Sequence, residues 1–283
     1  MANDCFYIGT RKQMVELRSP SVNVPSSKQG FSNKVDFLNG GTAIRRSLAA
    51  HKQYTMTWNF IERDDARVIT DLADGIYGTG PIYIHDPISA DRNVLPQWWA
   101  TPAQGLTDGL PLNDGTRGEA ATTPANSLGF PVDSITYTVQ PGQTRRVWVP
   151  IPPGYTAHVG AYGTNGSGGT VVATPTVDDV TDGTPVTLTL LNVTDNSRFN
   201  QSFAGSSFDG VELSLGGEGT VTLTAIMVQV LETGVTPTTG GFISGQGNSG
   251  LQFVTQPQYV PYSSALDKVG VVAELAEYYG WTS

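Results

Sequence analysis

The chain has 283 residues, a formal net charge of -9 and a single cysteine, Cys5. A chain of this length commonly forms about two domains, and its 33 glycines and 18 prolines, with only 14% charged residues, indicate short strands and turns, not bundled helices. One cysteine excludes an intramolecular disulfide and a multi-thiolate metal site, and the acidic balance argues against wholesale nucleic-acid binding.

The basic residues are unevenly distributed along the chain. Residues 1–92 carry eleven Lys and Arg against ten Asp and Glu, residues 93–232 carry four against twelve, and residues 233–283 carry one against three. The composition thus changes near residue 92 and partly changes back near residue 233. This pattern predicts a module that is inserted into, or placed beside, another unit.

The opening Met-Ala-Asn-Asp shows no signal-peptide pattern, and no apolar run approaches twenty residues. We therefore expect synthesis in a cytoplasm and no insertion into a membrane.

Residues 1–95 are predicted to form a β-rich unit, with strands expected at 14–18, 31–41, 54–60 and 82–84. In the third of these segments, apolar residues alternate with polar ones, which predicts a strand with one buried face. The alternating apolar residues are Tyr54, Met56, Trp58 and Phe60.

A short helix is predicted over residues 64–75. Asp64 or Asp65 is the expected cap at its start, and Gly75 is expected in the left-handed conformation at its end. The apolar stripe of this helix consists of Val68, Ile69 and Leu72.

Residues 96–128 have the Pro, Gly and Asn content of a linker, although the pair Trp98-Trp99 indicates that part of it is packed. Residues 129–234 contain strand-like segments separated by turns, which predicts a β-sandwich of jelly-roll type. These segments are 134–139, 145–149, 155–162, 185–191, 210–215 and 220–231. Residues 240–283 return to the aromatic, Gly-rich composition of the beginning, and the alternation of Val269, Val271, Ala273 and Leu275 predicts a strand there.

The motifs that could carry chemistry are weak. Gly245-Gln-Gly-Asn-Ser-Gly250 matches the spelling of a dinucleotide-binding turn, but a β-like segment closed by Pro257 follows where that motif requires a helix, so we interpret it as a Gly-rich turn. The three histidines, His51, His85 and His158, lie in separate segments without metal-ligand spacing. We predict no catalytic residues, no cofactor and no metal ligands.

Two kinds of charged segment allow more than one interpretation. A calcium ion near Asp178, Asp179 or Asp182 is compatible with the sequence, although a turn explains these residues as well. The pairs Arg45-Arg46 and Arg145-Arg146 are the clusters that phosphate binding would need, and we interpret them as ordinary solvated pairs.

Aromatic residues of the middle module are candidates for sugar binding, because sugars stack their apolar faces on exposed rings. Most of these aromatics must belong to the core, and those in polar, Gly-rich surroundings are the better candidates for an exposed loop. The predicted glycan-binding residues are Tyr162, Phe199, Phe203 and Phe208.

The outer parts of the chain carry a resemblance to a known family. The strand-rich opening, Tyr54-Thr-Met-Thr-Trp-Asn-Phe, the short helix, Gly78-Thr-Gly-Pro-Ile-Tyr-Ile-His-Asp-Pro, and the final segment from Gly245-Gln-Gly-Asn-Ser-Gly-Leu-Gln-Phe to Tyr279-Gly-Trp resemble distal tail proteins and related minor tail proteins of long-tailed (siphovirus-type) bacteriophages. The resemblance is greatest to those of actinobacterial hosts. It covers roughly residues 1–95 and 240–283 and consists of the order of elements, not of an active site.

The resemblance implies a mainly β fold with a distal-tail-type ring domain and an inserted galectin-like or carbohydrate-binding sandwich. It implies a virion protein of the tail tip, with copies of itself in a ring, commonly six, and with the tail tube protein, the tip hub and host cell-wall glycan as partners. One departure from the family is that the ring-forming part is split, so residues 240–283 have to complete the domain of residues 1–95. A separate third unit is the competing arrangement.

Two other functions remain open from the sequence. The chain could be a free carbohydrate-binding protein in which the sandwich of residues 129–234 is the functional part. A glycan-degrading enzyme is the weakest alternative, since glycoside hydrolysis needs two carboxylates facing each other across a cleft and no acidic pair in the sequence indicates that arrangement.

Overall fold

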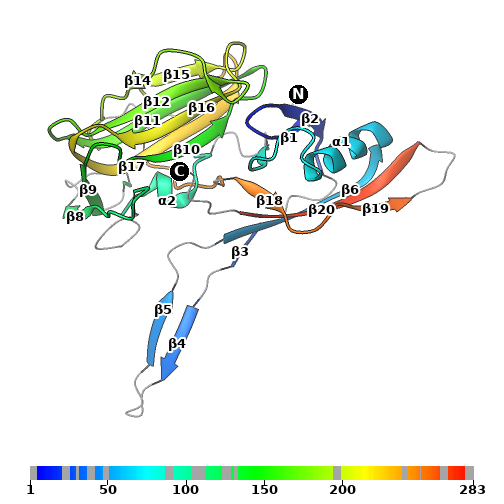
Figure 1. Cartoon of the computed structure of the whole chain (residues 1–283), viewed down its shortest axis with the longest axis horizontal. Helices are drawn as coiled ribbons and strands as arrows, with labels where there is room; N and C mark the ends of the chain where they lie inside the picture. The colour runs from blue at the N-terminus through cyan, green and yellow to red at the C-terminus, as the bar shows by residue number, and fades with distance from the viewer. Residues whose placement is uncertain are drawn as a thin grey trace.

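The computed structural model describes residues 5–20, 26–29, 32–36, 42–46, 51–86, 92–103, 112–122, 129–130, 133–193, 199–237, 241–248, 250–261 and 267–277. The predicted mainly β class is confirmed, because these residues form several antiparallel sheets and two short helices. Figure 1 shows a sandwich at one side of the molecule and a smaller sheet with a helix at the other.

The sandwich consists, within the described residues, of two antiparallel sheets of five strands each. One sheet has the order β10-β16-β12-β13, with β14 also paired to β12, and the other has the order β15-β11-β17-β9-β8. The strands are β8 (Glu119–Thr122), β9 (Asp133–Val139), β10 (Arg145–Pro150), β11 (Tyr155–Asn165), β12 (Thr170–Val177), β13 (Val180–Thr181), β14 (Val186–Thr187), β15 (Gln201–Ala204), β16 (Gly210–Gly216) and β17 (Gly219–Glu232).

Alternating residues of both sheets meet in the sandwich core. Val147 and Val149 of β10, for example, belong to the same buried cluster as Val228 and Val230 of β17. The sequence missed β12 because Pro175 interrupts its pattern. Pro175 is tolerated because β14 pairs with β12 before this position and β13 pairs with it after, so no neighbouring strand needs an N–H there. The Pro175 carbonyl, on the same side, accepts a hydrogen bond from the Asp182 amide at 3.2 Å. The strand predicted at 185–191 is limited to the two residues of β14.

The described parts of the predicted linker, 96–103 and 112–122, are packed into the sandwich. Helix α2 (Gln97–Ala100) carries Trp99, which is buried in the sandwich core together with Leu112. Residues 119–122 form the edge strand β8, which pairs with β9. The packing indicated by Trp98-Trp99 is therefore present, and it extends to residues 112–122, where the Pro and Gly content had indicated a linker.

The second main sheet is built from both ends of the described chain. Its order is β18-β20-β6-β3, with β19 also paired to β20. The central pair joins β6 to β20 in antiparallel register from Lys268↔Glu62 to Ala276↔Gln53. The strands are β3 (Ser26–Gln29), β6 (His51–Glu62), β18 (Leu251–Phe253), β19 (Gln258–Pro261) and β20 (Lys268–Glu277).

Strand β6 confirms the predicted alternation only up to Trp58. Met56 and Trp58 are buried, but Phe60 is 53% exposed and Ile61 is buried in its place. The register with β20 shifts between Val269 and Val271, so that two residues of β6 lie opposite one of β20. Such a β-bulge changes which face of the sheet the following residues occupy, and it explains why Phe60 leaves the core.

Helix α1 (Arg63–Ala73) covers one face of this sheet with Ala66, Ile69 and Leu72. The predicted ending is confirmed, because Gly75 has a φ of 76°. The predicted aspartate cap was wrong: Glu62 occupies the cap position without a side-chain hydrogen bond, and both aspartates lie in the first turn. A negative charge there is favourable because of the helix dipole.

A three-stranded sheet lies between the two cores. It has the order β2-β1-β7 and is formed by β1 (Cys5–Gly9), β2 (Met14–Arg18) and β7 (Tyr83–His85). In β1, Phe6 and Ile8 are buried in the core of the second sheet, whereas Tyr7 between them is buried in the sandwich core. Successive side chains of a strand point to opposite faces, so this sheet connects both cores.

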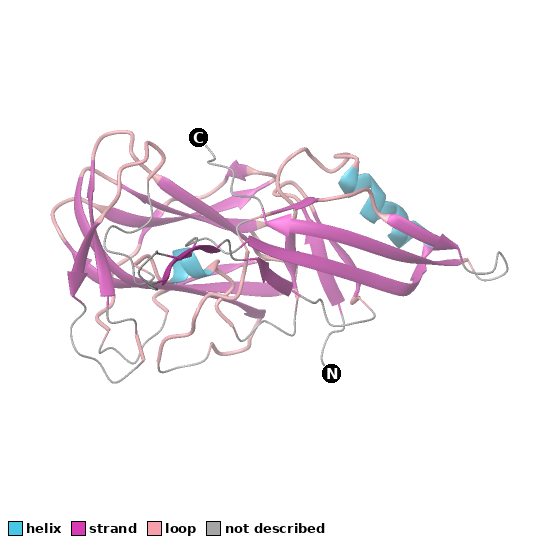
Figure 2. Ribbon diagram, turned by 90° about the horizontal axis from the view of Figure 1, so that it is seen from below, coloured by secondary structure: helices cyan, strands magenta, loops and turns pink. Residues whose placement is uncertain are grey.

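Strands β4 (Ser32–Asp36) and β5 (Thr42–Arg46) form a separate hairpin. Among the described strands they pair only with each other. Figure 1 shows this hairpin extending away from the rest of the molecule, beyond the end of β3, and Figure 2 shows the sandwich and the α1-covered sheet at opposite ends of the body.

The bulge in β6 makes a testable distinction between two apolar residues of one strand. Met56→Ala is expected to reduce the free energy of unfolding by about 2–5 kcal/mol, because it leaves a cavity in a packed core. Phe60→Ala is expected to change it by no more than about 0.5 kcal/mol, because the ring is largely solvated. Urea unfolding at a dilution where the protein is monomeric measures both, and equal losses would contradict the bulge.

Candidate functional site

The contact between the sandwich and the three-stranded sheet is organised by Arg11, which lies in the turn between β1 and β2. Its Nε is 2.7 Å from Asp179 Oδ1 and its Nη2 donates a hydrogen bond to Glu212 Oε2 at 2.9 Å. The guanidinium carbon also lies 5.6 Å from the centre of the Trp148 ring. Arg11 thus binds two acids and one aromatic ring of the sandwich, and because Glu212 is only 12% exposed, its charge is poorly compensated by water.

Aromatic side chains pack across the same contact. Tyr83 of β7 meets Trp148 of β10 edge-on, with ring centres 4.5 Å apart. His85, two residues further along β7, packs edge-on against Tyr155 of β11 at 4.8 Å. The alternation of Ile82, Tyr83, Ile84 and His85 therefore directs the aromatic residues to the sandwich and the isoleucines to the other core.

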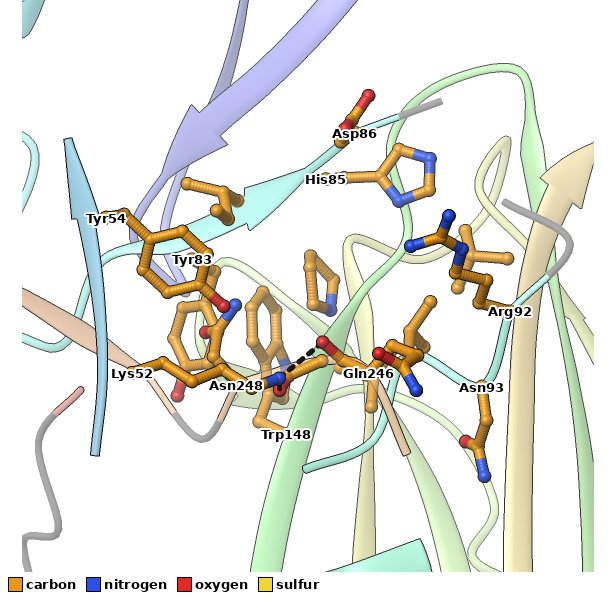
Figure 3. Close-up of a pocket in the computed structure, with 16 residues that line it drawn as sticks. Lys52, Tyr54, Tyr83, His85, Asp86, Arg92, Asn93, Trp148, Gln246 and Asn248 are labelled. Atoms are coloured by element: carbon orange, nitrogen blue, oxygen red, sulfur yellow. Dashed lines mark hydrogen bonds between the residues drawn. The ribbon is translucent and has the colours of Figure 1, made fainter. Parts of the chain in front are cut away.

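A cavity of about 170 Å³ lies beside these aromatic contacts (Figure 3). Its walls come from β6, β7, β10 and β17 and from residues 92–94 and 246–248, so both cores contribute to it. The charged residues in its lining are Lys52, Arg92 and Asp86. This cavity, bounded by charged groups of two modules, is a candidate site for a ligand.

Lys52 fixes one wall of the cavity. The side chain is buried, and its ammonium group donates hydrogen bonds to the carbonyls of Gln246 and Gly247. A Cβ at Gly247 would lie 1.5 Å from the carbonyl oxygen of Val94, so only glycine permits this approach of two backbones. The glycines of 245–250 therefore serve close packing, and β18 follows them instead of a helix.

Burial changes the proton affinity of two residues of the lining. It lowers the pKa of His85, which is 4% exposed, from its usual 6.5 to about 4. It also raises the pKa of Tyr83 to about 12, with smaller contributions from Arg11 in the opposite direction and from Asp179 and Glu212 in the same direction. His85 is therefore neutral at pH 7, and its Nε2 has no hydrogen-bond partner among the described residues.

The four predicted glycan-binding aromatics do not form one surface. Tyr162 is fully buried and packs on Phe130 with ring centres 4.4 Å apart. Phe203 lies in β15 and not in a loop, and it is 5% exposed. Phe208 packs edge-on against Phe203, and half-buried Phe199 lies near His158 in a different cluster. Burial removes Tyr162 and Phe203 from the rings that could stack on a sugar, because strand alternation turns them inward.

The structure also corrects the interpretation of Arg145 as a solvated residue. Its guanidinium carbon lies 4.3 Å from the centre of the Trp98 ring and 5.8 Å from that of Trp99. Burial lowers the pKa of Arg145 to about 10. The Trp pair of the expected linker therefore packs on an arginine of the sandwich.

The sequence did not identify Arg11, Tyr83, His85 or Arg92 as members of one site. The alternation of aromatic and aliphatic residues in β7 was an available signal that both faces of this strand are buried. Nothing in the sequence indicated which module would cover the aromatic face.

Of the acids considered for calcium binding, Asp179 pairs with Arg11 through its carboxylate. Asp178 and Asp179 have positive φ angles of 50° and 65°, and the Asp178 backbone amide donates to Asp209 Oδ2 at 2.9 Å, so these residues form a turn. In the described ranges, no three His, Cys, Asp or Glu side chains gather as metal ligands would. Neither helix of these ranges has the length and hydropathy needed to span a bilayer.

Removing Arg11 tests its contribution to the contact. Arg11→Ala is expected to reduce the free energy of unfolding by about 1–3 kcal/mol, since it leaves the partly buried Glu212 with only the longer ion pair to Arg146 (3.5 Å). The matched control is Arg67→Ala, because Arg67 is 79% exposed and its pair with Asp71 is 3.9 Å long. Denaturant unfolding should show that the control loses no more than about 0.5 kcal/mol of the free energy of unfolding. An equally small loss for Arg11→Ala would contradict the role of Arg11 in holding the contact together.

His85 predicts a pH dependence of stability. The pKa of His85 is about 4 in the folded chain and 6.5 in the unfolded chain, so the unfolded chain binds a proton more strongly at pH values between these two. The free energy of unfolding therefore keeps its full value above pH 6.5 and decreases as the pH falls to about 4, by at most about 3 kcal/mol. The free energy of unfolding, measured from pH 4 to pH 7.5, should change less steeply with pH in His85→Gln than in the natural chain. Equal slopes would contradict the lowered pKa of His85.

Comparison with known proteins adds little to this description. No protein-family model matches the chain, and no curated protein matches it in sequence. A chain in a solved structure of infectious bursal disease virus, Gt strain, is 11% identical over 96% of this chain and 74% of that chain, with a TM-score of 0.26. A likeness at this TM-score supports no inference about fold or function.

Proposed function

We propose that this protein is a structural component of a bacteriophage tail tip, where copies of it form a ring, six in number, that joins the tail tube to the tip hub. This proposal makes the protein a virion component without a catalytic role. It rests on the resemblance of residues 1–95 and 240–283 to distal tail proteins. It also rests on two features of these segments, a projecting hairpin and exposed apolar side chains of the second main sheet.

The observation that carries the proposal is the β4–β5 hairpin. It has five paired positions, from Ser32↔Arg46 to Asp36↔Thr42, and it extends from the body in Figure 1. An isolated two-stranded hairpin is only marginally stable in water, and its unpaired edges are ready to bind another chain. A neighbouring copy of the protein would supply the missing contacts.

The second main sheet offers further surface for such a neighbour. Phe60 of β6, Val260 of β19 and Val254, which follows β18, are 53%, 45% and 54% exposed. Exposed apolar side chains on one sheet are a feature of surfaces that become buried on association. The pairing of β6 with β20 supports the arrangement in which residues 240–283 complete the first domain, with the sandwich as a module set into it.

In this proposal the sandwich is peripheral and contacts host-surface glycan. Of the four aromatics predicted for that contact, Phe199 and Phe208 retain partial exposure. They belong to different clusters, so these predicted aromatics form no common stacking surface, either for the glycan contact of this proposal or for the alternative of a free carbohydrate-binding protein.

Deleting the hairpin tests the proposal. Gln29 and His51 are a paired position of β3 and β6, so replacing residues 30–50 by Asn-Gly should join these strands through a tight turn. Native mass spectrometry should show a closed oligomer for the natural chain and a monomer for this variant, because the variant lacks the connecting element.

The unfolding temperature of the variant serves as its control, since the sandwich and the α1-covered sheet should remain folded. A natural chain that stays monomeric at high concentration and together with the neighbouring tail proteins would overturn the proposal. Assembly of the hairpin-deleted variant would show that the hairpin is not the element that joins the copies.

A further inference from the structure

The cavity between the two cores has a charge opposite to that of the chain. Lys52 and Arg92 are cationic, Asp86 is the one acid of the lining in the described residues, and the chain as a whole carries -9. Two positive charges and one negative give the lining of this cavity of about 170 Å³ a formal charge of +1. Behind the lining, the buried carboxylate of Glu277 accepts a hydrogen bond from the Lys52 amide at 3.2 Å, so Arg92 carries the positive charge that faces the cavity without a nearby acid of this kind among the described residues. A single water needs roughly 10–15 Å³, so the cavity can hold a small polar molecule.

Arg92 is the accessible cation of this cavity. Its side chain is exposed, and it forms no ion pair or hydrogen bond with any residue that the structure describes. In Figure 3 its guanidinium points into the cavity, toward the ring of His85. A guanidinium presents parallel N–H donors that match the two oxygens of a carboxylate or phosphate group.

Two further residues of the lining lie near the space in front of Arg92, Lys52 across the cavity and His85 beside it. Lys52 contributes its positive charge from β6, where the buried ammonium is held by the carbonyls of Gln246 and Gly247. His85 is almost completely buried at the top of the view in Figure 3, and the described residues leave its Nε2 without a partner. The ring of His85 therefore forms part of the cavity wall, close to where the Arg92 guanidinium points, and can report on an anion bound there.

We propose that this cavity binds a small oxyanion, a phosphate or carboxylate group, with Arg92 as its main ligand and Lys52 as a supporting charge. The net positive lining disfavours a metal cation, and the charged and amide side chains disfavour an apolar molecule. The proposal goes beyond the ring function and does not depend on it.

Binding at this position would connect the two cores. Lys52 belongs to β6 of the second sheet, whereas Arg92 lies two residues before Val94, whose amide donates a hydrogen bond to the Val228 carbonyl of the sandwich at 2.9 Å. An anion held by both therefore stabilises their relative position, and it raises the unfolding temperature because it binds only the folded chain.

Isothermal titration calorimetry of the full chain at pH 7 and constant ionic strength tests the proposal, with inorganic phosphate and acetate as separate probes. At least one of them should bind to the natural chain, and Arg92→Gln should weaken that binding at least tenfold. Arg67→Gln, which removes an exposed arginine of α1, should leave it within twofold. Binding of phosphate alone would identify a phosphate-bearing ligand, and binding of acetate alone would identify a carboxylate. Binding of both would show that the site recognises the oxyanion that the two probes share.

A spectroscopic readout locates the anion. The chain has three histidines, so the Hε1 signal of His85 can be assigned from its loss in His85→Gln, and the bound probe should shift it in the natural chain but not in Arg92→Gln. Absence of binding by both probes, equal binding by Arg92→Gln, or binding that leaves the His85 signal unchanged would each overturn the proposal.

Discussion

The architecture depends on the fact that β1 and β7 are buried on both faces, with a different core on each. Phe6 and Ile8 enter one core and Tyr7 the other, and in β7 the isoleucines and the aromatic residues divide in the same way. Because successive side chains of a strand point to opposite faces, one short strand can supply residues to both cores. A change of register by one residue would exchange both sets at once, so the two modules are tied to a single alignment.

The polar features of the contact follow from this arrangement. A middle layer that carries aromatic residues toward the sandwich brings the Arg11 turn against Asp179 and Glu212, and it leaves a cavity where the ends of several strands meet. Charges there are partly shielded from water and therefore interact more strongly than at an open surface. The same contact that holds the modules together concentrates the groups able to recognise a ligand.

Much of the fold could be predicted from local patterns. The alternation in 269–275, the stripe and terminal glycine of α1 and most sandwich strands were expected, because each depends on a few adjacent residues. The bulge at Phe60, the strand containing Pro175 and the packing of Trp98 and Trp99 on Arg145 were not, because each depends on a partner distant in sequence. The candidate site was missed for the same reason: Lys52, His85 and Arg92 line one cavity only when the two cores meet.

The pairing of β6 with β20 also sets an order for folding during synthesis. Glu62 and Lys268 are 206 residues apart, so β6 is synthesised long before the strand that lies beside it. Contacts of such separation form late, after the local hairpins of the sandwich. Until residue 277 has left the ribosome, the apolar face of β6 with Met56 and Trp58 lacks its central neighbour, and a chain truncated before β20 would expose this face to aggregation.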